Sequence, residues 1–422
     1  MPRVGDAGRM LVLATCGFTV CFWAWALISP LGSTYADELH LDGFQQALVV
    51  SVPVVVGSLG RIPVGALTDR FGARVMFPAV SALTILPVLF VGFAAHSLPA
   101  LLGGGFFLGV GGTAFAVGVP FVNGWYPPER RGTALGVFGA GTIGTAISSF
   151  STVQIASALG RGAPFLLVAA VLAVFAIVSW VMLRSPAPAR PQPTGATPTR
   201  PAPAGRGVLA TFRRPVTLQL ALLYALGFGG FVAFSVYLPT YLVNSYGLTR
   251  GDAALRTAGF VVLAVVARPA GGWLSDRVGP ARVLVVCFLG ATVFAALAAF
   301  RLNLLPASTV AFLGLALVLG GASGAVFALV GTHVEAASVG AVTGVVGAAG
   351  GLGGFVPPLV MGLLYDATGH YLWGLLLLAL ASLLLALFTW RVFGRPPTAP
   401  PSSPSSPDDG TTTGMSTEGS TR

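Results

Sequence analysis

Two arginines stand inside long apolar stretches of this 422-residue chain, where a fixed charge is costly. Arg61 lies within the segment GSLGRIPVG, and Arg268 lies within AVVARPAGG. Each is followed eight residues later by an aspartate, Asp69 or Asp276. The arginines lie the same 207 residues apart as the aspartates (61 to 268, 69 to 276), which indicates an internal duplication with one arginine in each copy.

The composition places these stretches in a lipid bilayer. Hydrophobic residues make up 55% of the chain and charged residues 9%, too few to cover the surface of a water-soluble protein. Twelve segments reach the ~20 residues that a membrane-spanning helix needs. We therefore predict an all-α polytopic membrane protein with spans at 10–31, 44–68, 75–95, 98–123, 133–157, 163–184, 216–243, 252–275, 281–301, 305–330, 339–363 and 371–394.

The spans divide into two halves of six. GTALGVFGAG from Gly132 and GAVTGVVGAAG from Gly340 repeat at nearly the same offset as the arginines, which supports a parallel duplication. We predict an N-terminal six-helix half at 1–184 and a C-terminal half at 215–395. The Pro- and Arg-rich segment 185–214 is predicted to be a cytoplasmic linker, and the Pro/Ser/Thr-rich segment 396–422 a disordered cytoplasmic tail.

The arginines between the spans predict the orientation. The side that carries both termini has most of them, and the opposite side has only Arg161, Arg250, Arg256 and Arg301. The positive-inside rule then places both termini in the cytoplasm and the protein in the cytoplasmic (inner) membrane. Because the net charge of +10 is spread between apolar segments rather than gathered in one patch, we expect no nucleic-acid partner.

Small residues surround both arginines on their own helix faces, with Gly57 and Gly65 beside Arg61 and Ala264 and Gly272 beside Arg268. None of the thirteen acidic residues lies deep in a predicted span, so neither arginine has an internal carboxylate. A buried charge without such a partner needs an anion from elsewhere. The alternative is that each side chain extends to the membrane interface, but the duplicated environment favours a paired anion site.

Each aspartate belongs to a loop of the form Gly-x3-Asp-Arg-x-Gly, followed closely by another arginine. The glycines permit tight turns, and the aspartates could pair with an arginine in a latch that breaks when the halves rock. The simpler interpretation is a turn that carries positive-inside charges. We predict that these are cytoplasmic gate loops, with the residues Asp69, Arg70, Arg74, Asp276, Arg277 and Arg282.

We find no sequence motif for binding a metal or a cofactor. Cys16, Cys21 and Cys287 fall within apolar segments and read as small core residues. No nucleophile–base set or metal-ligand spacing is present. We therefore predict that the protein is not an enzyme, binds no metal and no cofactor, and works as a monomer.

The gate loops and the six-plus-six layout resemble the major facilitator superfamily. Within it, the stretches GVGGTAFAVGVPFVNGWYP from Gly109 and GAVTGVVGAAGGLGGF from Gly340 resemble the nitrate/nitrite porter family. Glycines at helical spacing also let two helices in lipid pack closely. The glycines that match the family signatures are Gly136, Gly139, Gly141, Gly344, Gly347, Gly351 and Gly354.

The resemblance implies that Arg61 and Arg268 contact the anion from opposite halves, with Phe115, Tyr224 and Phe228 as the aromatic residues around it. The aromatic residues on their own would suggest ordinary core packing. The first family signature usually carries an asparagine where this chain has Thr142, whose hydroxyl could donate one hydrogen bond. A planar anion with three acceptor oxygens suits a planar guanidinium.

The resulting hypothesis is alternating-access transport of nitrate, nitrite or both. Two unpaired charges in an empty site favour nitrate/nitrite exchange, and proton-coupled nitrate uptake is the other mode that the resemblance implies. A carrier of another small anion, such as a carboxylate or cyanate, is an alternative on the same architecture. A membrane sensor that no longer transports is a third possibility.

Overall fold

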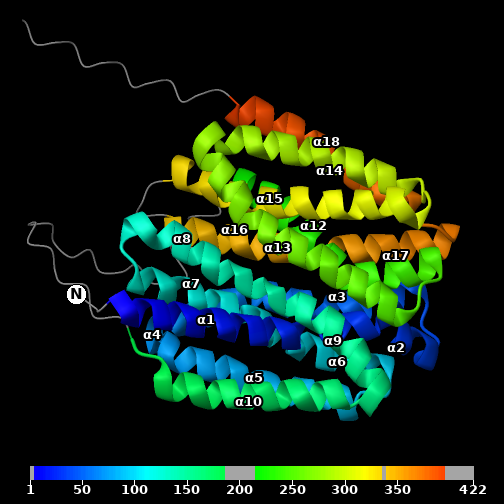
Figure 1. The fold of residues 1–422 in the computed structure, drawn as a ribbon, viewed down its shortest axis with the longest axis horizontal. Helices are drawn as coiled ribbons and strands as arrows, with labels where there is room; N and C mark the ends of the chain where they lie inside the picture. Colours follow the sequence, from blue (N-terminus) through cyan, green and yellow to red (C-terminus); the bar gives the residue numbers. More distant parts are fainter. Residues whose placement is uncertain (1–3, 186–213, 335–338, 395–422) are drawn as a thin grey trace, which may run out of the picture.

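A computed structural model describes residues 4–185, 214–334 and 339–394. In this part of the chain, twelve helical segments are long and apolar enough to cross a membrane, and they run back and forth through the molecule (Figure 1). The predicted number and order of spans are confirmed, although several helices extend beyond the predicted ends. The predicted tail and nearly all of the predicted linker lie outside the described residues.

Four of the six spans of the first half are interrupted by a break or a short 3-10 helix, and glycines lie at most of these interruptions. One such break is Gly60, where a span divides just before Arg61. The helices of this half are α1 (Val4–Trp25), η1 (Ser29–Leu31), α2 (Gly32–Leu39), α3 (Gly43–Leu59), α4 (Arg61–Phe71), α5 (Ala73–Phe93), α6 (Leu98–Leu108), η2 (Gly109–Thr113), α7 (Ala114–Trp125), α8 (Pro128–Gly139), η3 (Ala140–Ile143), α9 (Gly144–Leu159) and α10 (Ala163–Met182).

The second half repeats the six spans with fewer interruptions. Its arginine helix, α13, is continuous from Arg250 to Val278, whereas the corresponding span of the first half is divided into α3 and α4. The helices of this half are α12 (Pro215–Tyr246), α13 (Arg250–Val278), α14 (Pro280–Ala299), η4 (Leu304–Ser308), α15 (Thr309–His333), α16 (Val339–Gly353), α17 (Val356–Thr368) and α18 (Leu372–Phe393).

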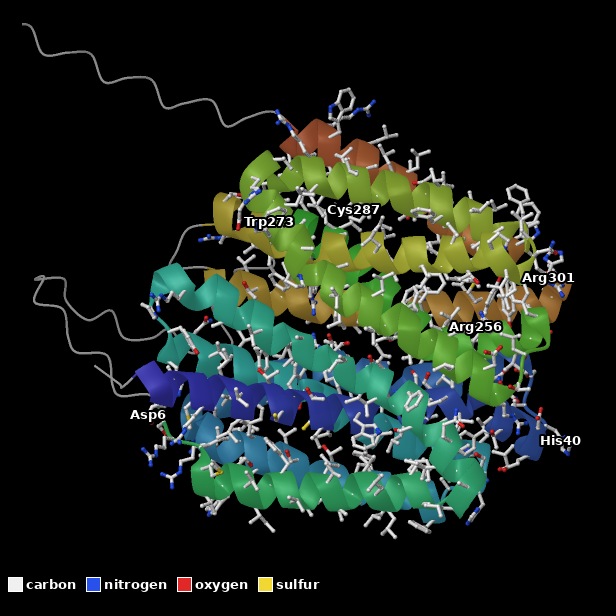
Figure 2. All side chains as sticks on the ribbon, in the orientation of Figure 1. Asp6, His40, Arg256, Trp273, Cys287 and Arg301 are labelled. Carbon is white, nitrogen blue, oxygen red and sulfur yellow. The ribbon has the colours of Figure 1, made fainter. Side chains whose placement is uncertain are left out.

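The turns define two ends of the molecule. Gly72 (φ 78°) joins α4 to α5, and Gly279 (φ 94°) joins α13 to α14; only glycine adopts such angles without strain. We call this end the loop end, which includes Asp6 and Trp273 in Figure 2. The opposite end, called the far end, includes His40 and Arg301 (Figure 2). The predicted role of these glycines in tight turns is confirmed.

The outer helices present large apolar side chains to their surroundings. Leu86 of α5, Ile177 of α10, Val286 of α14 and Trp390 of α18 are each more than half exposed. In water such a surface would drive aggregation, whereas in a bilayer it faces lipid tails. Together with the twelve spans, this surface identifies a multi-pass membrane protein.

Backbone-to-backbone packing of α13 on α15 positions Arg268. A Cβ atom added to Gly324 would lie 2.0 Å from the carbonyl oxygen of Arg268, and one added to Gly320 would lie 2.2 Å from that of Ala264. Gly271 of α13 approaches Gly321 of α15 equally closely. The two helices therefore touch without side chains between them, which leaves the Arg268 backbone little freedom to shift.

We expect Gly324→Ala to destabilise the second half, because its methyl group would collide with backbone that cannot move aside. Overpacking of this kind costs about 1–3 kcal/mol. Thermal unfolding of the purified protein in detergent should show a lower midpoint for Gly324→Ala. Gly331→Ala on the same helix is the matched control, since nothing lies within 4 Å of a Cβ atom there. Equal midpoints for the two variants would contradict this view of the packing.

Candidate functional site

Arg61 is the first residue of α4, immediately after the break at Gly60. Its Nη1 donates a hydrogen bond of 2.9 Å to the backbone carbonyl of Gly347 in α16, which belongs to the other half. Its Nε is buried and has no hydrogen-bond partner. This guanidinium therefore links the two halves through Nη1, while its Nε keeps a free N–H donor.

Arg268 lies in the middle of α13 and is held by α12 of its own half. Its Nη2 donates a hydrogen bond of 2.6 Å to the hydroxyl of Tyr224. Its guanidinium carbon lies 4.8 Å from the ring centre of Phe228. The rings of Tyr224 and Phe228 are stacked, with centres 5.0 Å apart and planes within 5°. One aromatic pair thus supplies both a hydrogen bond and a cation–π contact.

Arg61 has a matching aromatic neighbour in its own half. The guanidinium carbon of Arg61 lies 5.0 Å from the ring centre of Phe115 on α7. Phe115 in turn packs against Phe18 and Phe138, which keep its ring in place. The structure thus brings together all five of the predicted arginine and aromatic residues, and each arginine lies against a ring from its own half.

The two guanidiniums lie close enough for their like charges to repel. Among the described residues, the ion pairs are Arg161–Glu38, Arg250–Asp37 and Arg256–Asp252, and none of them involves Arg61 or Arg268. The groups that contact the two arginines, a carbonyl, a hydroxyl and two rings, are all neutral. The site consequently keeps a positive charge that its surroundings do not neutralise.

Thr142, the residue predicted to donate to an anion, points elsewhere in this conformation. It is buried in η3, and its hydroxyl donates a hydrogen bond of 2.9 Å to the carbonyl of Gly139. Gly139 itself is near the site, since a Cβ atom there would lie 3.8 Å from Nη1 of Arg268. Thr142 therefore belongs to the layer behind the arginines, and its hydrogen would have to turn to reach an anion.

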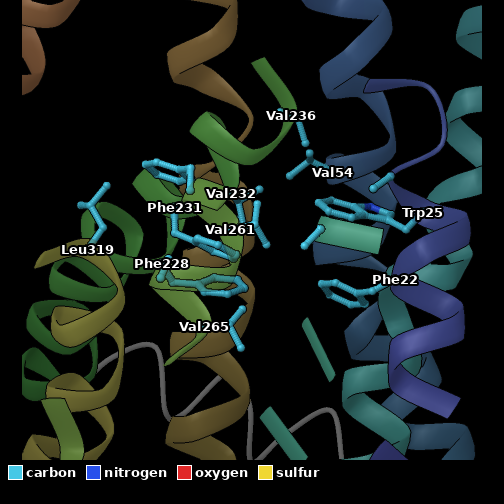
Figure 3. Close-up of a cluster of buried hydrophobic side chains, with 14 of the residues drawn as sticks. Phe22, Trp25, Val54, Phe228, Phe231, Val232, Val236, Val261, Val265 and Leu319 are labelled. Carbon is cyan, nitrogen blue, oxygen red and sulfur yellow. The ribbon is translucent and has the colours of Figure 1, made fainter. Parts of the chain in front are cut away.

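A narrow cavity beside Arg61 extends toward the far end between the halves. Its lining includes Trp25, Ser58 and Phe228. The indole nitrogen of Trp25 donates to the carbonyl of Pro53, which fixes the ring across the cavity. Figure 3 shows Phe22, Trp25 and Val54 from the first half opposite Phe228, Val232 and Val236 from the second. Trp25 and Ser58 were not predicted from the sequence, because neither belongs to a repeat or charge pattern.

The predicted signature glycines of α16 and the segment after it serve two different surfaces rather than one. Gly347 and Gly351 face the first half: a Cβ atom on Gly351 would lie 2.1 Å from Oγ of Ser58. Gly354 instead packs against Val232 of α12, and Gly344 has open space around it. These glycines therefore do not share one packing surface.

Two glycines outside the predicted set pack at least as tightly. A Cβ atom on Gly350 would lie 2.2 Å from the ring of Tyr224, and one on Gly353 would lie 2.2 Å from the carbonyl of Ala225. In the first half, Gly141 lies against Phe18, whereas Gly136 has open space around it. Gly350 and Gly353 thus let α16 pack directly on α12 around Tyr224, whose hydroxyl holds Arg268.

The six predicted gate-loop residues are exposed at the loop end, and none of them forms an ion pair with a described residue. Arg277 lies over the ring of Trp273 at 3.9 Å, and Arg70 lies over that of Phe71 at 5.1 Å. The predicted latch between an aspartate and an arginine is not formed in this conformation. The remaining four residues of the set are Asp69, Arg74, Asp276 and Arg282, the last of which lies in the first turn of α14.

Comparison with known proteins agrees with this architecture. The profile of the Major Facilitator Superfamily matches residues 14–262 and 244–417. The structure is similar to that of a bacterial homolog of the human lysosomal transporter Spinster, crystallised in an inward-facing and unoccupied conformation. The TM-score is 0.70 with 18% identity, over 92% of this chain and 96% of that one. This likeness concerns the fold alone.

Several curated relatives match over nearly their whole length. The probable nitrate/nitrite transporter NarK2 of Mycobacterium tuberculosis (strain ATCC 25618 / H37Rv) is 49% identical over 90% of this chain and 95% of its own. The nitrite extrusion protein of Bacillus subtilis (strain 168) is 38% identical over 90% and 94%. The probable nitrate transporter NarT of Staphylococcus carnosus (strain TM300) is 34% identical over 91% and 96%. The chain therefore belongs to the major facilitator superfamily and, within it, to the nitrate/nitrite porter family.

Proposed function

We propose that this protein carries nitrate and nitrite across the membrane by alternating access, with Arg61 and Arg268 as its anion-binding pair. The observation that carries the proposal is the site's uncompensated charge: two guanidiniums from opposite halves lie near each other, and no described carboxylate pairs with either of them. The buried Nε of Arg61 is an unused donor directed at no protein group. An anion with several acceptor oxygens satisfies both requirements at once.

The flat surroundings of the arginines favour a planar anion. Phe115 and Phe228 lie 5.0 and 4.8 Å from the two guanidinium carbons, so the walls beside the charges are rings. Nitrate and nitrite are planar and can lie between such rings while they accept in-plane hydrogen bonds. The three relatives, named as a probable nitrate/nitrite transporter, a nitrite extrusion protein and a probable nitrate transporter, support the same substrate class.

Hydrogen bonds between the halves suggest which side of the carrier is closed. Among the described residues, those bonds join Ser29 to Ser235 and Val236, Gln46 to Thr240, Asp366 to the start of α3, Asp37 to Arg250, and Arg61 to Gly347. All except the last lie on the far-end side of the arginines. The conformation is therefore taken to be closed at the far end, with the gate loops apart.

The positive-inside rule supplies the sidedness of this proposal. The loop end, with Arg70, Arg74, Arg277 and Arg282, faces the cytoplasm together with both termini, and the protein resides in the cytoplasmic membrane as a monomer. The halves 1–184 and 215–395 act as the two rocking units, and 185–214 links them. The aspartates of the gate loops would find arginine partners when the loop end closes.

Exchange is the favoured mode because of the charge that remains when the site is empty. The Gly347 carbonyl and the Tyr224 hydroxyl each occupy one arginine donor, but neither carries a negative charge. Reorienting two like charges through an apolar interior without a counter-ion is costly. Return with a second anion bound avoids this cost, so nitrate entering would be exchanged for nitrite leaving.

We expect Arg61→Lys and Arg268→Lys to lose nitrate affinity about 10- to 100-fold, because lysine keeps the charge but not the planar pair of donors. Nitrate binding to the purified protein, measured by calorimetry, tests this expectation. Arg256→Lys is the matched control, since Arg256 pairs with Asp252 on its own helix away from the site. Unchanged affinity in both site variants would rule out the arginines as the anion-binding pair.

Tyr224→Phe isolates the hydroxyl that holds Arg268. The ring and its stacking on Phe228 remain, while the 2.6 Å hydrogen bond is removed. We expect nitrate affinity to fall about tenfold because the guanidinium is no longer oriented. Tyr246→Phe is the control, since that hydroxyl bonds Ser308 at the far end. A fall of the same size in both variants would show that the effect is not local to the site.

Proteoliposomes test substrate and coupling together. With nitrite inside and nitrate outside, we expect nitrate uptake to require internal nitrite and to be unaffected by an imposed pH gradient. Uptake into nitrite-free vesicles that follows an inward proton gradient would establish proton coupling and overturn exchange. Cyanate and small carboxylates added outside should compete poorly with nitrate; strong competition would move the substrate class to another small anion.

A further inference from the structure

The first turn of α3, at the far end, takes its hydrogen-bond partners from both halves. A helix leaves its first N–H groups without partners, and they need acceptors from outside the helix. The side chain of Asp42 caps α3 in the usual way and accepts from the N–H of Gln45 at 2.7 Å. The N–H groups of Gly43 and Phe44 are not reached by that cap.

Asp366 of α17, in the other half, accepts from both of these groups. Its Oδ1 lies 2.7 Å from the nitrogen of Gly43, and its Oδ2 lies 2.7 Å from that of Phe44. Hydrogen bonds to a carboxylate are stronger than neutral ones, and a negative charge at a helix N-terminus also gains from the helix dipole. The first turn of α3 is thus completed only while the halves touch.

Close backbone contact makes this arrangement possible. A Cβ atom on Gly43 would lie 2.5 Å from Oδ1 of Asp366, and one on Gly362 would lie 2.5 Å from the carbonyl oxygen of Gly43. Both positions therefore need glycine for Asp366 to reach the helix. The contact is specific in shape as well as in charge.

Aromatic contacts within its own half hold the chain next to Asp366 in place. Tyr365, next to Asp366, stacks on Tyr371 with ring centres 4.5 Å apart. The Tyr371 hydroxyl accepts from the side chain of Asn244 on α12 at 3.0 Å. Burial raises the pKa of Tyr371 to about 12, so it stays a neutral phenol beside the carboxylate. The end of α17, which carries Asp366, is therefore held in place by this packing.

We infer that Asp366 is the latch of the far end: it caps α3 across the two halves, and its release accompanies opening of the carrier on that side. When the halves part, the N–H groups of Gly43 and Phe44 pass to water, so the bonds favour the closed state. The nearby pairs Arg250–Asp37 and Arg161–Glu38 are partly exposed, and the second joins residues of the same half. Exposed ion pairs contribute little. Asp366 is exposed as well, but its two bonds to one helix end join the halves directly, beside the buried bonds of Ser29 and Gln46.

The test measures opening without any anion, so its outcome does not depend on the proposed substrate. Val236, almost fully buried between the halves, is changed to cysteine in full-length protein from which Cys16, Cys21 and Cys287 have been removed. The protein is placed in lipid nanodiscs, and the rate of reaction with a water-soluble maleimide is followed. Asp366→Asn removes the charge at nearly constant size.

We expect Asp366→Asn to raise the labelling rate about tenfold, as loss of two charge-assisted hydrogen bonds predicts. Gly43→Ala should raise it as well, because its methyl group displaces the carboxylate while leaving its charge. The two changes act on one contact, so the double variant should exceed the stronger single one only slightly. Asp252→Asn is the matched control at the same end, since Asp252 bonds only within α13.

If Asp366→Asn is labelled at the same rate as the protein that retains Asp366, the inference is overturned. Equal increases in Asp366→Asn and Asp252→Asn would overturn it as well. Additive effects in the double variant would mean that Gly43 and Asp366 act separately, and this too would contradict a shared latch. If Asp366→Asn does not yield folded protein by size-exclusion chromatography, Gly43→Ala decides alone, with an unchanged rate counting against the latch.

Discussion

Two guanidiniums that share no ion pair with any described residue are the constraint on which the rest of this structure depends. Arg61 and Arg268 come from opposite halves, and their contacts are a carbonyl, a hydroxyl and two aromatic faces. Each of these groups favours a cation without cancelling its charge. A carboxylate in their place would neutralise the site and remove its need for an anion, so the weakness of the compensation is what suits the site to binding.

Such a site keeps its geometry only if the helices that carry it cannot drift. The contacts made by glycine provide this rigidity, because backbone meets backbone at Gly320 and Gly324 on α15 and at Gly353 beside α12. Lipid tails are as apolar as the side chains, so burying a side chain between helices gains little free energy in a membrane. Close backbone packing is therefore a main source of helix association there. The glycines at these contacts therefore serve the packing around the arginines rather than flexibility.

The sequence predicted the parts of this protein that repeat or that break a strong pattern. Apolar length predicted the twelve spans, and the duplicated loops predicted the turns at Gly72 and Gly279. Two charges inside apolar spans predicted that Arg61 and Arg268 belong to one region of the structure, and their role in binding an anion stays a proposal. Residues such as Ser58 and Asp366 escaped, since their significance lies in contacts with chain about 300 residues away. Thr142 shows the same limit, because it was predicted to donate a hydrogen bond to the anion, and its hydroxyl bonds the carbonyl of Gly139 in this conformation.

The hydrogen bonds between the halves are of one type at the far end and of another at the arginine site. This difference connects anion binding to the movement of the halves. At the far end they are cap, amide and hydroxyl bonds that no substrate replaces. At the site the attachment is the bond from Arg61 to the Gly347 carbonyl, which a bound anion would compete with. In the proposed cycle, an anion bound between the arginines would weaken the central attachment, and the far-end bonds would then determine whether the halves part there. An empty carrier would keep both attachments, which is the behaviour that the proposed exchange requires.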